Sequence, residues 1–573
     1  MSGGDDTVRW RLPARWRPPH PVFAFHEDTN ANAALVTPDG EVYAVAEERL
    51  SRKKFQAGFP ALSLAWLEQE SGIRVQDAPL LVFGNRTHFL PRLLGKRFPS
   101  FDHDFFGAVH KLMLCYQHVC YASPRFSALM ERFNRTLLAQ RLGKPAVIID
   151  HHRAHAASAY YGSGRRRACA ITADNYGDGY AAAVFRCDGP DIEFLRGVPA
   201  TRSPGQFYGE MAQLAGIAPM QAGKLTGMAA SGDPAALIDE VRAAFDVTAD
   251  GRGFSSTLGL RRSPNRSPWR ELAARDRVDL AAAVQRHFED ALLVFVREAV
   301  AETGCRDLVL AGGCFANVRL NQRALELPGV DSVHVHPAMT DQGISLGAAL
   351  AYIGGLNRPE PFRLEHVFLG PEPSEADMVA AMQRHRLSYS RPDDLPGAAA
   401  RALAQGAMVA RVSGPMEYGL RALGNRSILY QTQDPDLQAK INAKLRRAAY
   451  MPFAPMTMAE HASQCYLDAE QGLDPARFMT IAFHATEWMK QNSPGVVHVD
   501  GTVRPQILPR ADNPEMHDIL RAYHQITGNP SLLNTSFNMH GEPIVTTAED
   551  ACQAFVSAGL DHLILGPFLA TAP

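Results

Sequence analysis

Apolar and polar segments alternate along the chain in the order expected of strands and helices of an α/β protein. Residues 21–36 and 41–47 are predicted to form a strand pair around the turn at 38–40. Residues 167–187 repeat that pattern, because the apolar run 169–173 also leads into a glycine turn. Two similar strand-turn-strand openings predict an internally duplicated fold.

The periodicity also predicts where the chain divides. Residues 278–303 have the apolar spacing of an amphipathic helix, and the strand 308–310 follows. Residues 88–142 are rich in helix formers and aromatics, which favours a helical insertion that lines a binding pocket. Residues 354–375 have the composition of a linker, although 367–371 already belong to the second domain. We therefore expect one domain over 22–360 and a second over 361–573.

Residues 1–21 form an unusual N-terminal extension. Trp10, Trp16 and several arginines stand between prolines. Tryptophan and arginine side chains both cover apolar area, so we expect the extension to pack across the protein surface. A membrane or partner contact is the alternative.

Composition favours a cytoplasmic enzyme of two domains. A chain of 573 residues exceeds what one core organises, and 46% hydrophobic residues can build two. No apolar run long enough to span a membrane and no secretion signal is expected. The 8 cysteines have no CxxC spacing, which favours reduced thiols. The net charge of −2 argues against a nucleic-acid partner.

The strongest chemical signal is a pair of histidines four residues apart. On a helix, His151 and His155 project from one face, so both imidazoles can bind one metal ion. Asp174 and Asp341 could complete a site of two histidines and two aspartates. Such a donor set suits iron(II) or zinc. A histidine pair of this spacing also occurs by chance on helix surfaces, so the prediction depends on the two acids.

Two glycine-containing segments have the form of phosphate-binding loops. In 310–321 an apolar strand runs into a Gly-Gly turn and then a polar helix. In 337–349 glycines stand at a predicted helix start, where backbone N–H groups and the helix dipole favour phosphate oxygens. The residues expected to contact a nucleotide there are Gly312, Gly313, Asn317, Asn321, Gly343 and Gly347.

Together with the segments 25–28, 33–36, 46–54 and 223–229, these clusters match a known family. The chain resembles the O-carbamoyltransferases that act on antibiotics and nodulation factors, from about residue 21 to its end. The resemblance implies a first domain similar to the tRNA threonylcarbamoyl transferases and to the duplicated ATPase fold of actin, sugar kinases and heat-shock chaperones. A smaller α+β domain similar to YrdC is implied to follow.

The C-terminal third matches the family's nucleotide and carbamoyl phosphate domain at 414–429, 452–455, 500–506 and 533–545. Its guanidinium groups suit bidentate phosphate recognition, and its amide and hydroxyl groups suit a carbamoyl amide. The residues concerned are Arg421, Arg426, Arg504, Asn534, Thr535, Ser536 and Asn538. Arginines and Asn/Ser loops also form ordinary ion pairs and caps, and this alternative stays open.

One segment departs from the family pattern. Residues 445–455 lack a glutamate and the arginine that precedes Pro452 in relatives, while Arg447 keeps its place. We expect Arg447 to be catalytic, but the contact with phosphate falls to Arg447, Lys444 or Arg446.

The resemblance implies a reaction in two stages. Carbamoyl phosphate and ATP, with magnesium, first yield carbamoyladenylate, and a hydroxyl of a small natural product then takes the carbamoyl group. Fe(II), with zinc as the alternative, is implied at His151, His155, Asp174 and Asp341. The antibiotic-type acceptor itself is not readable from the chain.

The resemblance also suggests roles near the N-terminus. His26 is the candidate base for the acceptor hydroxyl, and Lys54 the candidate to orient phosphate. Lys224 and Gly227, in the matching segment 223–229, are expected to contact the nucleotide. A histidine after a strand also commonly bonds the backbone, and Lys54 belongs to a basic run that is equally typical of a solvated face.

Two other functions remain open at this point. A transferase that modifies tRNA adenosine, of the threonylcarbamoyladenosine type, uses both kinds of domain, but the charge balance disfavours it. A binding protein of the ATPase fold that has lost catalysis is the other alternative, and the histidines, acids and arginines together argue against it.

Overall fold

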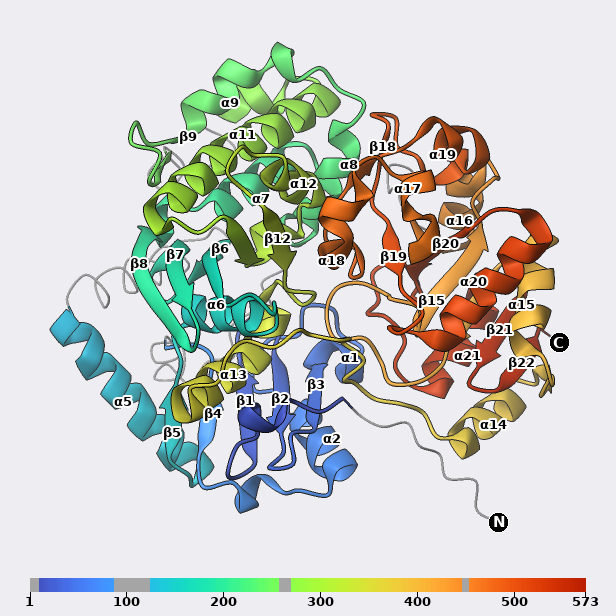
Figure 1. The fold of residues 1–573 in the computed structure, drawn as a ribbon, viewed down its shortest axis with the longest axis horizontal. Coiled ribbons are helices and arrows are strands. Elements are labelled where there is room, and N and C mark those ends of the chain that lie inside the picture. The colour runs from blue at the N-terminus through green and yellow to red at the C-terminus, as the bar shows by residue number, and fades with distance from the viewer. Residues whose placement is uncertain (1–9, 87–123, 257–268, 446–452, 573) are drawn as a thin grey trace.

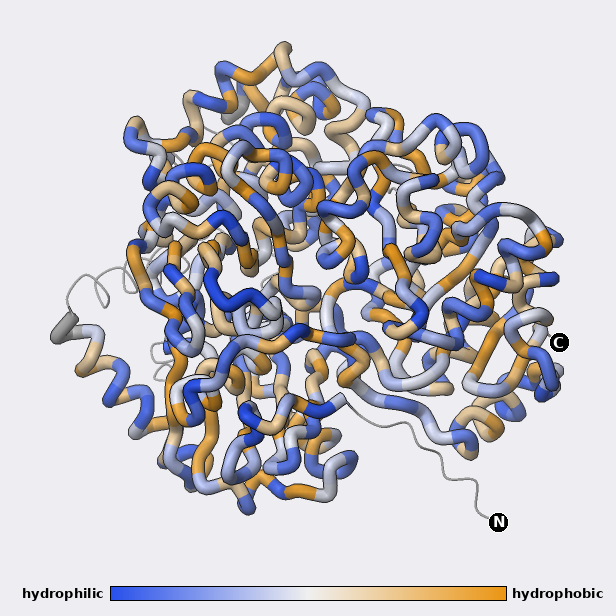
Figure 2. Tube along the Cα trace, in the orientation of Figure 1, coloured by the Kyte–Doolittle hydropathy of each residue, from blue (hydrophilic) through white to orange (hydrophobic). Residues whose placement is uncertain are grey.

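The computed structural model describes residues 10–86, 124–256, 269–445 and 453–572. Figure 1 shows two lobes at the left, in blue and in cyan to green, and a third lobe in orange and red at the right. Residues 358–373 connect the second and third lobes and form only isolated bridges. In Figure 2 apolar positions follow the strands, whereas outer helices such as α5 (Pro124–Leu142) alternate between apolar and hydrophilic positions.

The first lobe contains a five-stranded sheet in the order β3-β2-β1-β4-β5. Its strands are β1 (Val22–His26), β2 (Asn32–Val36), β3 (Val42–Ala46), β4 (Leu81–Phe83) and β5 (Ala146–Ile148). The first three pair antiparallel, and β4 and β5 continue parallel to β1. Asn30, with a φ of 62°, turns the chain between β1 and β2. The predicted strand pair around 38–40 is confirmed as β2 and β3, but residues 21–36 form two strands rather than one.

The second lobe repeats this sheet. Its strands are β6 (Arg167–Gly177), β7 (Tyr180–Asp188), β8 (Asp191–Pro199), β11 (Asp307–Ala311) and β12 (Ser332–Val335). Their order is β12-β11-β6-β7-β8, again with three antiparallel strands followed by two parallel ones. The same order and directions in both sheets confirm the predicted duplicated α/β fold.

Two helices lie between the sheets. α13 (Ile344–Asn357) packs on β1 and β2, and α6 (His151–Tyr161) packs on β6 and β11. Both helices share one buried core with residues of the two sheets. A Cβ on Gly347 would lie 2.1 Å from the carbonyl oxygen of Ala154, so the two helices touch backbone to backbone at this point. Only glycine permits that approach.

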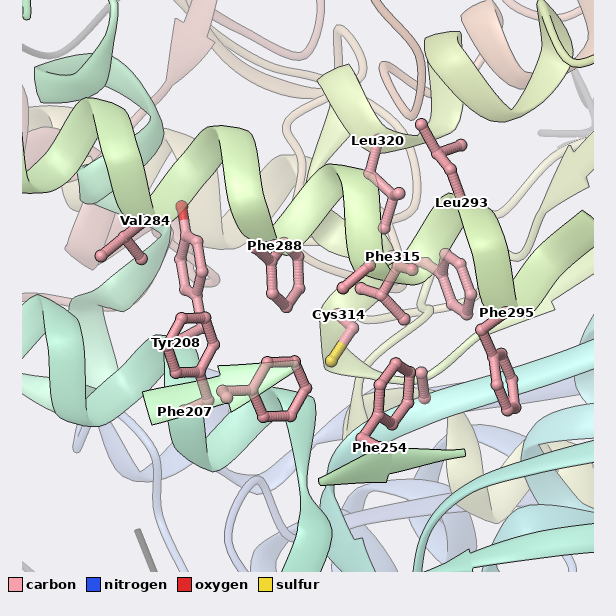
Figure 3. Packing of buried hydrophobic residues seen from close by; sticks show 14 of the residues in the cluster. Phe207, Tyr208, Phe254, Val284, Phe288, Leu293, Phe295, Cys314, Phe315 and Leu320 are labelled. Carbon is pink, nitrogen blue, oxygen red and sulfur yellow. The ribbon is translucent and has the colours of Figure 1, made fainter. Parts of the chain in front are cut away.

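The outer faces of both sheets are covered by helices. α2 (Ala61–Ser71) lies over the first sheet, and α11 (Arg277–Thr303) over the second with α7 (Pro204–Leu214), α9 (Ile238–Ala244) and α12 (Val318–Leu325). The predicted helix over 278–303 is confirmed. Its start is capped by Asp276, whose carboxylate accepts the N–H groups of Val278 and Asp279. Figure 3 shows Phe288 and Phe295 of α11 packed toward Phe315, Phe207 and Phe254.

The third lobe has an eight-stranded mixed sheet in the order β13-β22-β21-β14-β15-β20-β16-β19. α15 (Leu395–Ala404) and α20 (Pro514–Thr527) cover one face, and α14 (Glu375–Arg384), α16 (Leu437–Leu445) and α21 (Ala548–Ala558) the other. The strands are β13 (Ser388–Ser390), β14 (Val409–Val412), β15 (Arg426–Gln431), β16 (Ala454–Met458), β19 (Gln506–Leu508), β20 (Ser531–Ser536), β21 (His562–Leu565) and β22 (Phe568–Thr571). A smaller α+β lobe after the duplicated one agrees with the predicted fold class.

Short elements complete the described chain. They are α1 (Glu47–Ser51), η4 (Pro219–Lys224), α8 (Leu225–Ala229), β9 (Phe245–Val247), β10 (Phe254–Ser256), α10 (Trp269–Ala273), η7 (Asp341–Gly343), α17 (Ala462–Cys465), α18 (Leu473–Ala476), β17 (Phe483–His484), α19 (Glu487–Asn492) and β18 (Thr502–Val503), with further single 3-10 turns. Several of them border the cavity described below.

The described part of the N-terminal extension packs on the first lobe. The Trp16 side chain is buried against Tyr161 and Phe362, and its Nε1 donates to the Glu360 carbonyl at 2.9 Å. Trp10 packs on the same Phe362 ring. The aromatic residues thus cover apolar surface, as the sequence predicted.

Part of the predicted insertion over 88–142 lies outside the described residues, and its described part is the helix α5. Among the helices that the structure describes, none combines the length and apolarity needed to cross a bilayer.

The contact of α6 with α13 makes a stability prediction. Gly347→Ala should destabilise the protein by roughly 1–3 kcal/mol, because its new methyl group would overlap the Ala154 carbonyl. Gly355→Ala is the matched control on α13, since a Cβ there meets nothing within 4 Å and alanine favours helix. Urea unfolding followed by circular dichroism should show an earlier transition for the first variant alone. Equal midpoints would contradict the close packing.

Candidate metal centre and interlobe cavity

Helix α6 places the side chains of two histidines close together. Its first turn is fixed by the Asp150 carboxylate, which accepts the Arg153 N–H, and by Asp178, which accepts the His151 N–H at 2.8 Å. One turn separates His151 from His155, and their ring centroids lie 4.7 Å apart. Both side chains are buried. The predicted helical placement of this pair is therefore confirmed.

Two carboxylates meet these imidazoles from other elements. Asp174 lies on β6, beyond the last residue that pairs with β11, and Asp341 begins η7 before α13. His155 Nε2 lies 3.2 Å from Asp174 Oδ2 and 3.4 Å from Asp341 Oδ1. His151 Nε2 lies 3.6 Å from the same Asp341 oxygen. Segments of the first and second lobes thus supply one cluster of four side chains.

The cluster concentrates charge where solvent screening is weak. Burial and the nearby Asp174 charge raise the pKa of Asp341 to about 8. Burial alone would lower the pKa of His155, but hydrogen bonds to Asp174 and Asp341 outweigh it and raise this pKa to about 9. Burial alone would raise the pKa of Asp174, but the hydrogen bond and charge of His155, with two backbone hydrogen bonds, together outweigh it and lower this pKa. A cation in this position would neutralise both carboxylates.

The donor set fits a transition metal. One ligand atom from each of His151, His155, Asp174 and Asp341 can be chosen so that all lie within 4.8 Å of one another. Two imidazole nitrogens and two carboxylate oxygens suit iron(II) or zinc, whose bonds to such atoms are about 2.0–2.2 Å long. The Asp174 carboxylate also accepts the backbone N–H of Gly313 at 3.1 Å, which orients it toward the histidines.

The neighbouring histidines have other positions. His152 points away from the cluster, because its Nδ1 lies 2.8 Å from the Thr172 hydroxyl and its Nε2 3.0 Å from the Tyr180 carbonyl. His26 ends β1, is buried, and places Nε2 3.9 Å from Asp341 Oδ2. His26 is not among the described residues that line the adjoining cavity.

A cavity of about 650 Å³ extends from the cluster into the third lobe. Its volume is in the range of small-molecule sites, roughly 300–1,000 Å³. The predicted site residues that line it are Lys54, His151, Asp174, Lys224, Gly227, Gly313, Asn317, Asp341, Arg421, Arg504, Asn534, Thr535, Ser536 and Asn538. Residues from opposite ends of the chain therefore share one chamber.

Two guanidinium groups at this chamber lack an acidic partner within the described part of the chain. Arg421 and Arg504 make no ion pair with any carboxylate that the structure describes. Burial lowers the pKa of Arg504 to about 10. Burial and the nearby positive charge of Arg504 lower the pKa of Arg421 well below its usual value. Two partly buried cations side by side favour a multiply charged anion such as a phosphate.

Polar groups on β20 and the loop after it form the adjoining wall. Asn534 Nδ2 donates to the Ala422 carbonyl at 3.0 Å and to Gln506 Oε1 at 2.8 Å. Ser536 Oγ donates to Asn538 Oδ1 at 2.6 Å. The network holds these amide and hydroxyl groups in fixed positions around the chamber.

Arg426 does not reach the chamber. It is fully buried, and its guanidinium donates to the backbone carbonyls of Gly414 at 3.0 Å and Pro371 at 2.8 Å. Its predicted contact with phosphate is not supported, because both terminal nitrogens donate to backbone carbonyls and Arg426 is not among the lining residues. Asn321 likewise donates at 2.7 Å to the carbonyls of Phe315 and Thr480, which joins the second and third lobes.

Three of the predicted phosphate-binding glycines serve backbone packing instead. A Cβ on Gly312 would lie 2.2 Å from the Ala173 carbonyl, and one on Gly343 would lie 2.2 Å from the Ala338 carbonyl. Gly347 makes the helix contact described above. None of the three is among the lining residues of the chamber. These glycines therefore allow two backbone segments to pack closely. The sequence alone does not distinguish that role from phosphate binding.

Of the basic residues near the departure from the family pattern, Arg446 and Arg447 lie outside the described residues. Lys444 donates to the Gly559 carbonyl and is not a lining residue.

The sequence prediction missed several lining residues. Tyr176 and Asn175 follow Asp174, and Thr340 precedes Asp341, so chain neighbours of the acids were the available signal. Arg319 Nε of the second lobe lies 3.9 Å from Asp500 Oδ2 of the third lobe. No local sequence pattern indicates that pair. The further lining residues that were missed include Asp28, Thr29, Asn30, His498, His540 and Glu542.

Comparison with known proteins gives a consistent result. Profiles described as carbamoyltransferase N-terminus and carbamoyltransferase C-terminus match residues 22–350 and 400–572. The nodulation protein NolNO of Sinorhizobium fredii is 31% identical over 94% of this chain and 78% of its own length. The nodulation protein NolO of Bradyrhizobium diazoefficiens is 34% identical over 74% of this chain and 78% of its own length.

Solved structures are more distant. Full-length HypF in its phosphate- and nucleotide-bound form is 14% identical, with a TM-score of 0.34 over 59% of this chain and 56% of that chain. A likeness at that level does not bear on the fold or the site.

The cluster makes a prediction about bound metal. Protein produced with iron or zinc should carry close to one ion per chain, and His155→Ala should lose most of it, because this imidazole approaches both carboxylates. His152→Gln, on the same helix, is the control and should keep its metal. Elemental analysis of gel-filtered protein measures both. A His155→Ala protein with the metal content of the unmodified chain would contradict the assignment.

Proposed function

Because the chain belongs to the carbamoyltransferase family, we propose that it forms carbamoyladenylate from carbamoyl phosphate and ATP and transfers the carbamoyl group to a hydroxyl of a small natural product. Family membership makes it a carbamoyltransferase. The proposal concerns the identity of the carbamoyl donor, the carbamoyladenylate intermediate and the antibiotic-type acceptor.

The observation that carries the proposal is the shared chamber. It joins a cluster of metal ligands from the first two lobes to two half-buried arginines of the third, neither paired with a described acid. The arginines suit phosphate groups, and the cluster suits the polarisation of a carbonyl. An activated intermediate made at one end can react at the other without entering solvent, which protects it from hydrolysis.

In the first stage carbamoyl phosphate releases phosphate on reaction with water and leaves carbamate. A carbamate oxygen then bonds to the α-phosphorus of ATP, and the bond to the β-phosphate oxygen breaks to release pyrophosphate. Arg421 and Arg504 neutralise the phosphates, which offsets the repulsion between two anions. The amide and hydroxyl groups from Asn534 to Asn538 bind the carbamoyl amide.

In the second stage the acceptor hydroxyl attacks the carbamoyl carbon and AMP leaves. His151, His155, Asp174 and Asp341 would hold iron, with zinc as the alternative, and the bound metal supplies Lewis acidity toward an oxygen. Lys54 and Lys224, which line the chamber, hold phosphate oxygens of the adenylate.

The position of His26 favours an indirect role. Its imidazole lies beside Asp341 and away from the lining of the chamber, so we now assign it to the positioning of that carboxylate. General base catalysis requires contact with the hydroxyl proton, directly or through one water molecule. The acceptor proton therefore needs a group on the chamber wall.

Pyrophosphate release tests this function. The protein should release pyrophosphate from ATP only when carbamoyl phosphate is present. Arg504→Ala should lower that rate by roughly 10- to 100-fold, since charge-assisted hydrogen bonds to phosphate are lost. Arg504→Lys should retain part of the rate, because the charge remains without the bidentate fork.

The control is Arg521→Ala, which removes an exposed arginine on α20 and should leave the rate unchanged. The Arg504→Ala protein should still transfer from supplied carbamoyladenylate. Release that is independent of carbamoyl phosphate, or equal rates in the Arg504→Ala and unmodified proteins, would overturn the proposed first stage.

A further inference from the structure

Three side-chain oxygens near the metal-ligand cluster are shut off from solvent and have no hydrogen-bond partner among the described residues. They are Asn30 Oδ1, Asn175 Oδ1 and Thr340 Oγ1. All three residues line the chamber. A buried polar atom without a partner is costly, so such atoms usually mark a place where a ligand or ordered water binds.

Chain connections fix these oxygens beside the cluster. Asn175 follows Asp174, and its backbone N–H donates to the Asp174 carboxylate at 2.6 Å. Thr340 precedes Asp341. Asn32 Nδ2 donates at 2.7 Å to the carbonyl of Asn30 and at 2.7 Å to the carbonyl of Asp341, which ties the β1–β2 turn to the same point. The oxygens therefore flank the two carboxylates that belong to the cluster.

From this placement we propose that Asn30, Asn175 and Thr340 bind the NH2 group of the carbamoyl group and make the transfer stage specific for carbamoyl over acyl groups of the same size. The inference rests on the proposed function, since it takes carbamoyladenylate as the donor. It goes further, because it assigns donor specificity to residues outside the metal ligands and the arginines.

The chemistry of the group fits the oxygens. A carbamoyl NH2 has two N–H donors, one of which is shared between two of the three oxygens in a three-centre hydrogen bond. Its lone pair is delocalised into the carbonyl, so it needs acceptors only. Its nitrogen lies about 2.2 Å from the carbonyl oxygen, as standard amide bond lengths require. A carbonyl that faces the cluster therefore brings the NH2 to the residues beside Asp174 and Asp341.

The same oxygens disfavour competing groups. The methyl of an acetyl group has the size of NH2 but donates no hydrogen bond, so it would leave the buried oxygens unpaired. A site built to accept hydrogen bonds rejects an analogue without donors much more strongly than an apolar pocket rejects a size change. Thr340 can also donate, but a methyl group offers it no acceptor either.

The test compares two stable adenylate mimics that differ only at this position. These are N-carbamoylsulfamoyl adenosine and N-acetylsulfamoyl adenosine, in which a sulfamate replaces the phosphate. Their Kd values are measured by calorimetry on the full-length, metal-loaded protein. The unmodified protein should bind the carbamoyl mimic roughly 10-fold or more tightly than the acetyl mimic.

Two variants remove one acceptor each. Thr340→Val keeps the shape of the side chain, and Asn30→Gly keeps the left-handed backbone at a φ of 62°. Each should lower the preference for the carbamoyl mimic by roughly 5-fold or more while leaving the Kd of the acetyl mimic within about 2-fold. Thr340→Ser, which retains the hydroxyl, is the matched control and should keep the preference. A general loss of structure would weaken both mimics and leave the ratio unchanged.

The outcomes separate this inference from the proposed function. If carbamoyl phosphate drives pyrophosphate release but the unmodified protein binds both mimics equally, the inference is overturned and the function stands. An unchanged preference in both Thr340→Val and Asn30→Gly, with the Kd of the acetyl mimic also unchanged, overturns it as well and assigns these oxygens to another donor such as the acceptor hydroxyl. Absence of carbamoyl phosphate-dependent release overturns the function on which the inference depends.

Discussion

The close approach of α6 to α13 is the contact on which the rest of the site depends. The two helices come from the two halves of the duplicated fold and meet where Gly347 faces the Ala154 carbonyl. That contact sets the distance between the histidines of α6 and Asp341, which stands one short turn before α13. A side chain at the contact would separate ligands whose atoms now lie within 4.8 Å of one another. The duplicated fold thus provides a rigid seam between two sheets, and the cluster lies at its end.

The same region is joined to the third lobe through α1. Gln342, next to Asp341, donates to Glu48 at 3.2 Å, and Arg49 donates to the Gly419 carbonyl at 2.9 Å, close in the chain to Arg421. Arg52 donates to the carbonyls of Pro543 at 2.9 Å and Ile544 at 2.6 Å. Arg49 and Arg52 also lie in ion pairs with Glu48, at 3.8 Å, and Asp550, at 3.3 Å. Arg49 and Arg52 therefore hold the lobes together, whereas Arg421 and Arg504, which line the chamber, make no ion pair with a described carboxylate.

Much of this arrangement could be predicted from local pattern. The histidine spacing on a helix, the repeated strand-turn-strand openings and the amphipathic stretch of α11 each depend on neighbours in the chain, and each agrees with the structure. The glycines were harder to interpret, because Gly343 and Gly347 follow a pattern that close packing and phosphate binding share. The backbone partners of Arg426, at Gly414 and Pro371, become visible only in the folded chain. The pairing of Arg319 with Asp500 is equally a product of tertiary contact.

The central claim is that the chamber makes an adenylate from a carbamoyl donor. Exchange of labelled pyrophosphate into ATP measures that step directly, because the label enters ATP only if adenylate formation is reversible on the protein. The metal-loaded, unmodified chain should catalyse this exchange when carbamoyl phosphate is present, without any acceptor, and should show none when carbamoyl phosphate is omitted or replaced by inorganic phosphate. Folded, metal-loaded protein that gives no exchange with carbamoyl phosphate, or equal exchange without it, would contradict the account.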